Sequence, residues 1–196
     1  FTYFHPELSA DSFTKTNDEV IGILDSGLGG IAMMEYLRHQ HPQTSFVMLA
    51  DQKNVPYGEK TREELLAIAR RNVSWFQKRG IRRVIVACNT LCSQAVDVIR
   101  DEFPDMDLVN IIDELCMFLA YEPVRAPLLI APSATVSSGK YTRGLREHFP
   151  DLQVLEKPLP ALASLIEEGA DSETVLAYLR KELSSYQGQV DSVILG

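Results

Sequence analysis

The chain has 196 residues, 45% of them hydrophobic, which is enough for the core of one large domain or two small ones. Its 27 acidic and 19 basic residues give a formal net charge of −8. This charge argues against a nucleic-acid or anionic-membrane partner and favours a small-molecule ligand. Three cysteines form an odd and sparse set, typical of reduced thiols, and no apolar run approaches a membrane span. The sequence therefore predicts a cytoplasmic protein with no membrane partner.

Short apolar runs alternate with longer helical patterns, which predicts an α/β fold with mainly parallel sheets. Residues 1–19 are polar and irregular and are expected to form an N-terminal extension. Strands are expected at residues 20–24, 45–49, 83–87, 108–111, 127–131, 152–155 and 192–195. Helices are expected near residues 30–40, 61–79, 91–102, 113–121, 138–148, 160–168 and 172–185. The second of these helices begins with Thr61 and Glu64 at the spacing of a capping box.

A proline-containing segment at residues 112–126 is a candidate boundary between two α/β units. We therefore predict a first domain over residues 20–115 and a second over residues 116–196.

Ligands of such sheets collect at the carboxyl ends of the strands, so the residues that follow each strand are the first candidates for a site. Asp25 and Ser26 open a glycine-rich turn, in the segment DSGLGG, after the first predicted strand. Tyr57 and Gly58 follow the second strand in VPYGEK. Cys88, Asn89 and Thr90 follow the third strand in VIVACNT.

Cys88 has two interpretations. Free cysteine is often a small buried hydrophobe, and this favours a structural role. A thiol where a strand ends and a helix begins lies in the positive field of the helix dipole, which lowers its pKa and makes it a candidate base or nucleophile. Asn89 and Thr90 could cap that helix or hydrogen-bond a ligand carboxylate.

A dinucleotide site is a competing interpretation, because the segment from Gly27 to Ala32 fits the G-x-G-x-x-A fingerprint and Asp51 ends the second strand where a ribose-binding acid belongs. The carboxylate of Asp25 argues against it, since it would repel the pyrophosphate that such a loop holds.

Taken together, DSGLGG, VPYGEK, VIVACNT, ATVSSGKY and DSVILG resemble glutamate racemase, in the aspartate/glutamate racemase superfamily. The resemblance runs from about Val20 to Gly196. It implies two Rossmann-like α/β domains related by a pseudo-twofold axis, with the active site in the cleft between them. It also implies cofactor-independent racemisation of glutamate by two thiols on opposite faces of the α-carbon, which supplies D-glutamate for peptidoglycan and cell shape.

The resemblance also implies roles for single residues. Cys88 matches the first catalytic cysteine, and Asp25 matches the aspartate that assists it. Glu167, in a looser match, corresponds to a carboxylate that assists the second cysteine; a solvated helix end explains it equally well. The residues expected to contact the substrate are Asp25, Ser26, Tyr57, Gly58, Asn89, Thr90 and Thr135.

Two departures from the family pattern stand out. Pro132 replaces a threonine of the second domain's Ala-Thr motif, which removes a hydroxyl and an N–H donor and could alter substrate preference. The family's second motif, Cys-Thr-His-Tyr-Pro, is expected after Leu-Gly, where the sequence ends at Gly196. We therefore expect a fragment that ends before the second catalytic cysteine and by itself does not invert glutamate.

Cys92 and Cys116 are expected to be core residues, and no metal or cofactor is expected. A homodimer is possible. Two alternatives to glutamate racemisation remain: an inactive dicarboxylate- or dinucleotide-binding protein on the same scaffold, and a related aspartate racemase.

Overall fold

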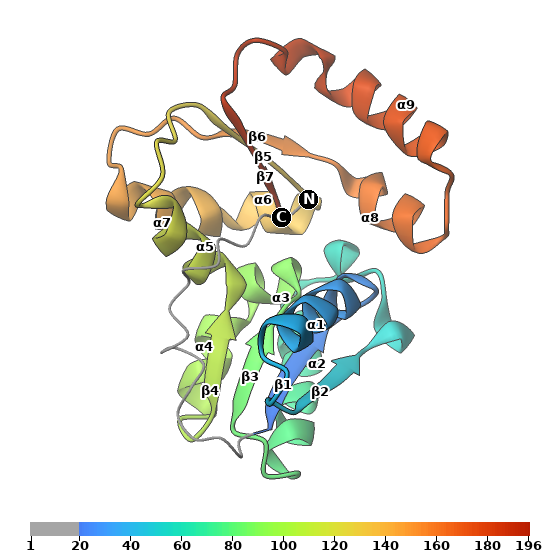
Figure 1. The fold of residues 1–196 in the computed structure, drawn as a ribbon, viewed down its shortest axis with the longest axis vertical. Coiled ribbons are helices and arrows are strands. Elements are labelled where there is room, and N and C mark those ends of the chain that lie inside the picture. Colours follow the sequence, from blue (N-terminus) through green and yellow to red (C-terminus); the bar gives the residue numbers. More distant parts are fainter. Residues whose placement is uncertain (1–19) are drawn as a thin grey trace.

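The structure is a computed structural model that describes residues 20–196. The predicted N-terminal extension, residues 1–19, lies outside the described residues. The remainder contains two sheets, one in the lower and one in the upper half of Figure 1. Every strand pairing in both sheets is parallel, which confirms the predicted α/β class.

The first sheet has the strand order β2-β1-β3-β4, and the second has the order β6-β5-β7. In each sheet, the first strand along the chain lies between the next two. The central strands β1 and β5 are buried at all five positions, as expected for parallel strands covered on both faces. The strands are β1 (Ile21–Asp25), β2 (Phe46–Ala50), β3 (Arg83–Val86), β4 (Asp107–Asn110), β5 (Pro127–Ala131), β6 (Leu155–Pro158) and β7 (Ser192–Leu195).

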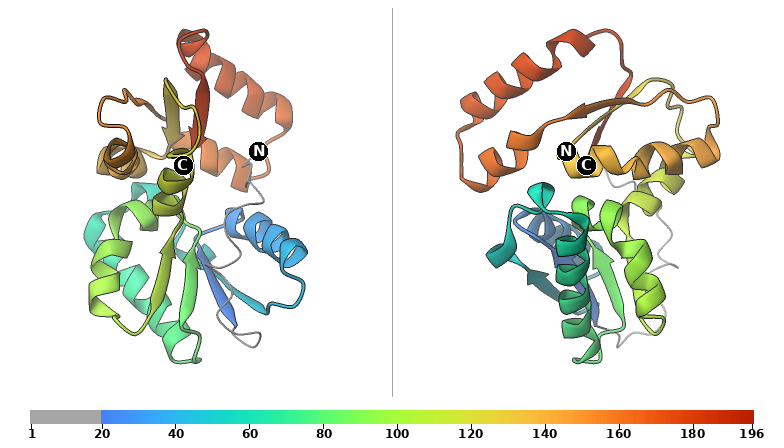
Figure 2. Two further views of the ribbon diagram at one scale, coloured as in Figure 1. Left: turned by 60° about the vertical axis from the view of Figure 1, so that its left-hand side comes forward. Right: turned by 180° about the vertical axis from the view of Figure 1, so that it is seen from behind.

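Helices connect the strands and cover both sheets (Figure 2). The helix α2 begins with the predicted capping box: the hydroxyl of Thr61 accepts from the N–H of Glu64, and the Glu64 carboxylate accepts from the N–H of Thr61 at 2.8 Å. The α-helices are α1 (Gly29–Gln40), α2 (Arg62–Gln77), α3 (Asn89–Gln94), α4 (Val96–Glu102), α5 (Ile111–Leu119), α6 (Ser133–Ser138), α7 (Lys140–His148), α8 (Pro160–Glu167) and α9 (Ser172–Leu183). Short 3₁₀ turns occupy Gln52–Asn54, Tyr57–Glu59 and Ser184–Tyr186.

Three elements differ from their predicted positions. The helix expected at 91–102 is divided at Ala95 into α3 and α4. The short helix α6 was not predicted; it precedes α7, and the two are separated by Gly139 at φ 63°, a left-handed conformation that glycine adopts without strain. The strand expected at 152–155 begins only at Leu155, because the apolar side chains of Leu152 and Val154 pack into the main core before the chain joins β5.

The main hydrophobic core joins the two sheets. It runs from the buried faces of α2, α3 and α4 through Cys116 of α5 to Leu129 and Ala131 of β5 and to Tyr141 of α7. The alternate residues of β5, Leu128 and Ile130, face a smaller second core beneath α8 and α9, as the two-residue period of a strand requires. The second sheet is therefore anchored on the core of the first.

The predicted domain boundary, between residues 115 and 116, falls inside α5. This helix packs against α7 of the second half of the chain, so the division into residues 20–115 and 116–196 stays a prediction. Within residues 20–196, no helix has both the length and the hydrophobicity needed to span a bilayer.

Candidate functional site

A pocket of about 500 Å³ lies between the two sheets. The residues that follow β1, β3, β5 and β7 line it, together with the turn at Tyr57 and one side of α8. The pocket thus occupies the place where parallel sheets collect ligands.

Eight of the nine predicted site residues line this pocket: Asp25, Ser26, Tyr57, Gly58, Cys88, Asn89, Thr90 and Glu167. The ninth, Thr135, is 1% exposed and is not part of the lining. Its hydroxyl oxygen lies 3.5 Å from that of Thr90, so Thr135 supports a lining residue from behind.

Cys88 directly precedes α3, as the sequence indicates, but its pKa is raised. The thiol is 5% exposed, and its Sγ lies 3.6 Å from the hydroxyl oxygen of Ser26. Burial, reinforced by the negative charge of Asp25, raises the pKa of Cys88 to about 12. The backbone N–H groups at the start of α3 and the Ser26 hydroxyl act in the opposite direction but do not offset burial. The expectation that the helix dipole makes this pKa low is therefore wrong.

Asp25 lies at the end of β1 and is held by the glycine-rich turn that follows it. One carboxylate oxygen accepts hydrogen bonds from the N–H groups of Gly27 at 3.2 Å and Gly30 at 2.8 Å. These are the donors that a dinucleotide-binding loop would offer to a pyrophosphate. Because the Asp25 carboxylate already accepts from these N–H groups, they are not available to a pyrophosphate, which argues against the dinucleotide interpretation.

Glu167 reaches the same turn from α8. A methyl group added to Gly27 would come within 1.8 Å of a Glu167 carboxylate oxygen, so a side chain at this position would displace the Glu167 carboxylate. Glu167 is exposed to solvent, and both Glu167 and Asp25 line the pocket. The turn after β1 and the end of α8, which belong to the two halves of the chain, therefore meet beside the pocket.

Tyr57 lines the pocket with its ring, and its hydroxyl points into a separate polar cluster. The hydroxyl donates to Asp51 at 2.6 Å, and Arg71 pairs with the same carboxylate at 2.5 Å. Burial and the carboxylate raise the pKa of Tyr57, whereas hydrogen bonds lower the pKa of Asp51. The sequence suggests Asp51 only as a ribose ligand. Its contacts with Tyr57 and Arg71 join residues from different elements and are not visible in the sequence.

Asn89 also has a partner that sequence reasoning missed. The hydroxyl of Tyr141, from α7, donates to the Asn89 side-chain oxygen at 2.6 Å. Tyr141 is the last residue of ATVSSGKY, so its motif was identified while its role was not.

The other two cysteines are buried in the core and do not line the pocket. The thiol of Cys92 donates to the carbonyl of Val86 at 3.0 Å, and that of Cys116 lies 3.8 Å from the carbonyl of Tyr141. Burial raises the pKa of both thiols, that of Cys116 to about 12.

The charges that line the pocket from the described part of the chain are carboxylates, of Asp25, Glu59 and Glu167, with no lysine or arginine among them. Between residues 20 and 196, no three His, Cys, Asp or Glu side chains are grouped so as to hold a metal ion. Pro132, the departure from the family pattern, lines the pocket beside Gly58; a methyl group on Gly58 would lie 2.9 Å from its Cβ. Hydrogen bonds to an anionic group of a ligand must therefore come from side-chain amides, hydroxyls and backbone N–H groups of this lining.

Comparison with known sequences identifies the family of this chain. The chain is 32% identical over 179 residues to glutamate racemase of Limosilactobacillus reuteri, a match that covers 90% of this chain and 66% of the relative. The chain belongs to the glutamate racemase family. A second glutamate racemase, of Picosynechococcus, is 39% identical over 147 residues, which are 75% of this chain and 52% of that protein. No protein-family model matches the chain.

A solved glutamate racemase has the same fold. The enzyme of Thermus thermophilus superposes with a TM-score of 0.79 at 28% identity, over 92% of this chain and 68% of that one. The chain spans 66% of the length of the Limosilactobacillus reuteri glutamate racemase.

Proposed function

We propose that the protein interconverts L- and D-glutamate without a cofactor and that the Cys88 thiolate exchanges the α-proton on one face of the substrate. The observation that carries the proposal is the position of Cys88: it is the thiol at the pocket, beside Asp25 and Ser26 and next to Asn89 and Thr90. Support comes from the glutamate racemases among the relatives and from the Francisella tularensis enzyme, whose structure was solved in complex with D-glutamate.

The raised pKa of Cys88 defines what the substrate must contribute. With a pKa of about 12, ionising this thiol at pH 7 costs about 7 kcal/mol, because each pKa unit corresponds to about 1.36 kcal/mol. A substrate ammonium group close to Cys88 and Asp25 would stabilise the thiolate and offset the repulsion by Asp25. Substrate binding and generation of the base are then one event.

The chemical step moves one proton on each face. The Cys88 thiolate takes the α-proton and becomes a thiol, and the electron pair of the C–H bond is delocalised into the α-carboxylate. Hydrogen bonds from the Asn89 amide and the Thr90 hydroxyl stabilise that developing charge. A proton donor on the opposite face then completes inversion; in the reverse direction the two groups exchange roles.

The opposite face is the side of α8 and β7. Glu167 lines the pocket there, and so does Gly196, which follows β7. In a longer gene product, the residue after Gly196 would enter at the edge of the pocket, where a cysteine would face Cys88 across the substrate. Sequencing the gene beyond this codon tests that part of the proposal.

The function is tested with the protein at the length its gene encodes. It is incubated in D₂O with L-glutamate, D-glutamate or aspartate, while NMR follows the α-proton and circular dichroism follows chirality. We expect exchange and inversion of both glutamate enantiomers, with aspartate at least tenfold slower. Binding of glutamate without α-proton exchange would identify the inactive binding protein instead, and faster reaction of aspartate would identify an aspartate racemase.

The cellular setting belongs to the same proposal. We place the protein in a bacterial cytoplasm, where its product serves peptidoglycan synthesis, and we expect a homodimer, which light scattering of the purified protein checks.

A further inference from the structure

Asn89 is held by a residue from the other half of the chain. It is the first residue of α3, directly after Cys88, and its side chain lines the pocket. Tyr141 lies in the first turn of α7, is 2% exposed, and donates its hydroxyl to the Asn89 oxygen at 2.6 Å.

In the structure, this hydrogen bond engages the oxygen end of the Asn89 amide and leaves its NH₂ end free. The carboxamide has one carbonyl acceptor and one NH₂ donor. With its carbonyl engaged by Tyr141, the NH₂ group is left for a ligand in the pocket. The reversed amide would present a carbonyl oxygen to the pocket and repel a carboxylate. Burial raises the pKa of Tyr141, so the phenol stays protonated and able to donate at neutral pH.

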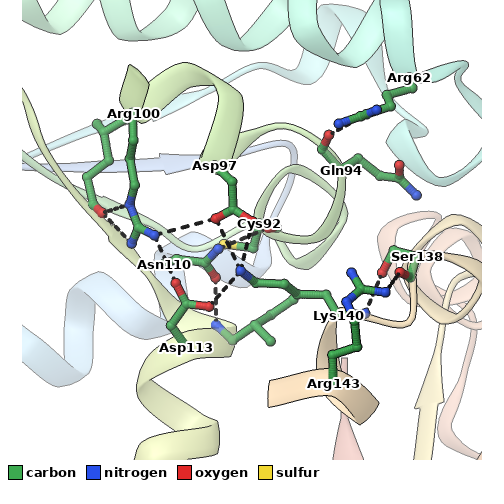
Figure 3. A network of polar contacts seen from close by, with 12 residues as sticks. Arg62, Cys92, Gln94, Asp97, Arg100, Asn110, Asp113, Ser138, Lys140 and Arg143 are labelled. Carbon is green, nitrogen blue, oxygen red and sulfur yellow. Dashed lines mark hydrogen bonds and ion pairs between the residues drawn. The ribbon is translucent and has the colours of Figure 1, made fainter. Parts of the chain in front are cut away.

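The start of α7 is itself fixed to the first half of the chain. The ammonium group of Lys140, the neighbour of Tyr141, lies 2.9 Å from carboxylate oxygens of both Asp97 and Asp113 (Figure 3). Arg100 pairs with Asp113 at 2.9 Å, which completes a network of four charged residues. Its members come from α4, α5 and α7.

Close packing adds a second restraint on α7. A methyl group on Gly144, one turn after Lys140, would lie 2.8 Å from the Cys116 sulfur of α5. The network and this contact together fix the height and rotation of Tyr141 relative to Asn89.

We propose that Tyr141 is a positioning residue, which holds the Asn89 amide so that its NH₂ group faces a carboxylate of the substrate. The inference rests on the proposed function and extends it, because it makes the geometry of the Cys88 face depend on a residue from the second half of the chain. It also gives the ion-pair network a role: keeping α7 where Tyr141 can reach Asn89.

The first test is Tyr141→Phe, which removes only the hydroxyl. We expect the Kd and KM for glutamate to rise about tenfold with kcat changed less than threefold, since a contact shared by ground and transition states acts on binding. The matched control is Thr142→Val on the same helix, which removes a hydroxyl that bonds Glu156 away from the pocket. We expect this control to bind glutamate as the unaltered protein does. Equal loss of affinity in both variants would overturn the proposal.

A double-mutant cycle separates positioning from general support of the fold. In an Asn89→Ala background, Tyr141→Phe should change the glutamate Kd by less than twofold, because there is no amide left to orient. If the tenfold loss persists in that background, Tyr141 acts by another route and the inference fails.

A measurement that does not depend on turnover distinguishes failure of the proposed racemase function from failure of the proposed role of Tyr141. The side-chain NH₂ signals of Asn89 in ¹⁵N-labelled protein should shift on glutamate binding, and this shift should shrink in Tyr141→Phe. If the unaltered protein binds glutamate but does not exchange its α-proton, the proposed function fails while a reduced shift still supports positioning. If glutamate binding leaves these signals unmoved in the unaltered protein, the inference fails.

Discussion

Cys88 and Cys92 lie one helical turn apart at α3 and differ in what surrounds them. Both are buried, at 5% and 1% exposure, and burial raises the pKa of both thiols. Cys88 adjoins Ser26 and the pocket, whereas Cys92 donates to the Val86 carbonyl within the core. The comparison shows that burial and pKa do not distinguish the two thiols, whereas their neighbours do.

The largest expected effect comes from Cys88→Ser. A hydroxyl is far less acidic than a thiol, so we expect racemisation of both enantiomers to fall at least about 1,000-fold. Circular dichroism assays started from each enantiomer measure it. If the variant retained a tenth of the activity or more, Cys88 would not be the catalytic base, and its different surroundings from those of Cys92 would have no catalytic meaning.

Asp25→Asn tests the difference between the two cysteines, because the Asp25 charge acts on the thiol of Cys88 and not on that of Cys92. We expect kcat to fall about 100-fold with a smaller change in KM, because the charge that raises the pKa of Cys88 also makes its thiolate a stronger base for the α-proton, an effect exerted mainly in the transition state. Steady-state kinetics in both directions check this. A raised KM with an unchanged kcat would assign Asp25 to binding alone.

The pH dependence of alkylation distinguishes the thiols directly. Alkylation follows the thiolate fraction, and the pKa of Cys88 is about 12, so its rate should rise about tenfold per pH unit from pH 7 to pH 10 without a plateau. Removing the charge of Asp25 should lower this pKa and speed alkylation at a given pH. Mass spectrometry of iodoacetamide-treated protein gives the rates, with Cys92 expected to stay unmodified while the protein is folded. A plateau near pH 8.5 would show an ordinary thiol at Cys88.

The smallest effect on activity is expected from Cys92→Ala. We expect the free energy of unfolding to fall by about 1–2 kcal/mol, because the substitution leaves a small cavity and removes a hydrogen bond. Racemisation should change less than threefold. Urea unfolding and the activity assay test the two halves of this expectation; a stable but inactive variant would place Cys92 in the mechanism.

Much of the fold could be predicted because the strands are short apolar runs between helical patterns. The predicted start of β6 was wrong because Leu152 packs into the core from outside the strand. A short apolar run in a sequence does not show whether its residues are buried in a strand or in a loop. Ala95, where α3 and α4 divide, carries no sequence signal for a break, since alanine is a strong helix former.

The site could be located because parallel strands bring their carboxyl ends to one edge, which gathers Asp25 and Cys88 without any knowledge of side-chain contacts. The bonds that hold the site were not predictable in the same way. Tyr141 meets Asn89 across 52 residues, and Arg71 meets Asp51 across 20. The raised pKa of Cys88 was missed for a related reason: helix position is local and visible in a sequence, whereas depth of burial depends on the whole fold.

The absence of lysine and arginine from the described pocket lining affects which metabolites can enter. A carboxylate-lined cavity without cationic side chains disfavours a phosphate group, because it offers that group no opposite charge. Glutamate is also a net anion at neutral pH, but its ammonium group can pair with the carboxylate of Asp25 or Glu167. The lining therefore favours a ligand that carries a cationic group of its own, and the carboxylates of such a ligand must be met by neutral donors.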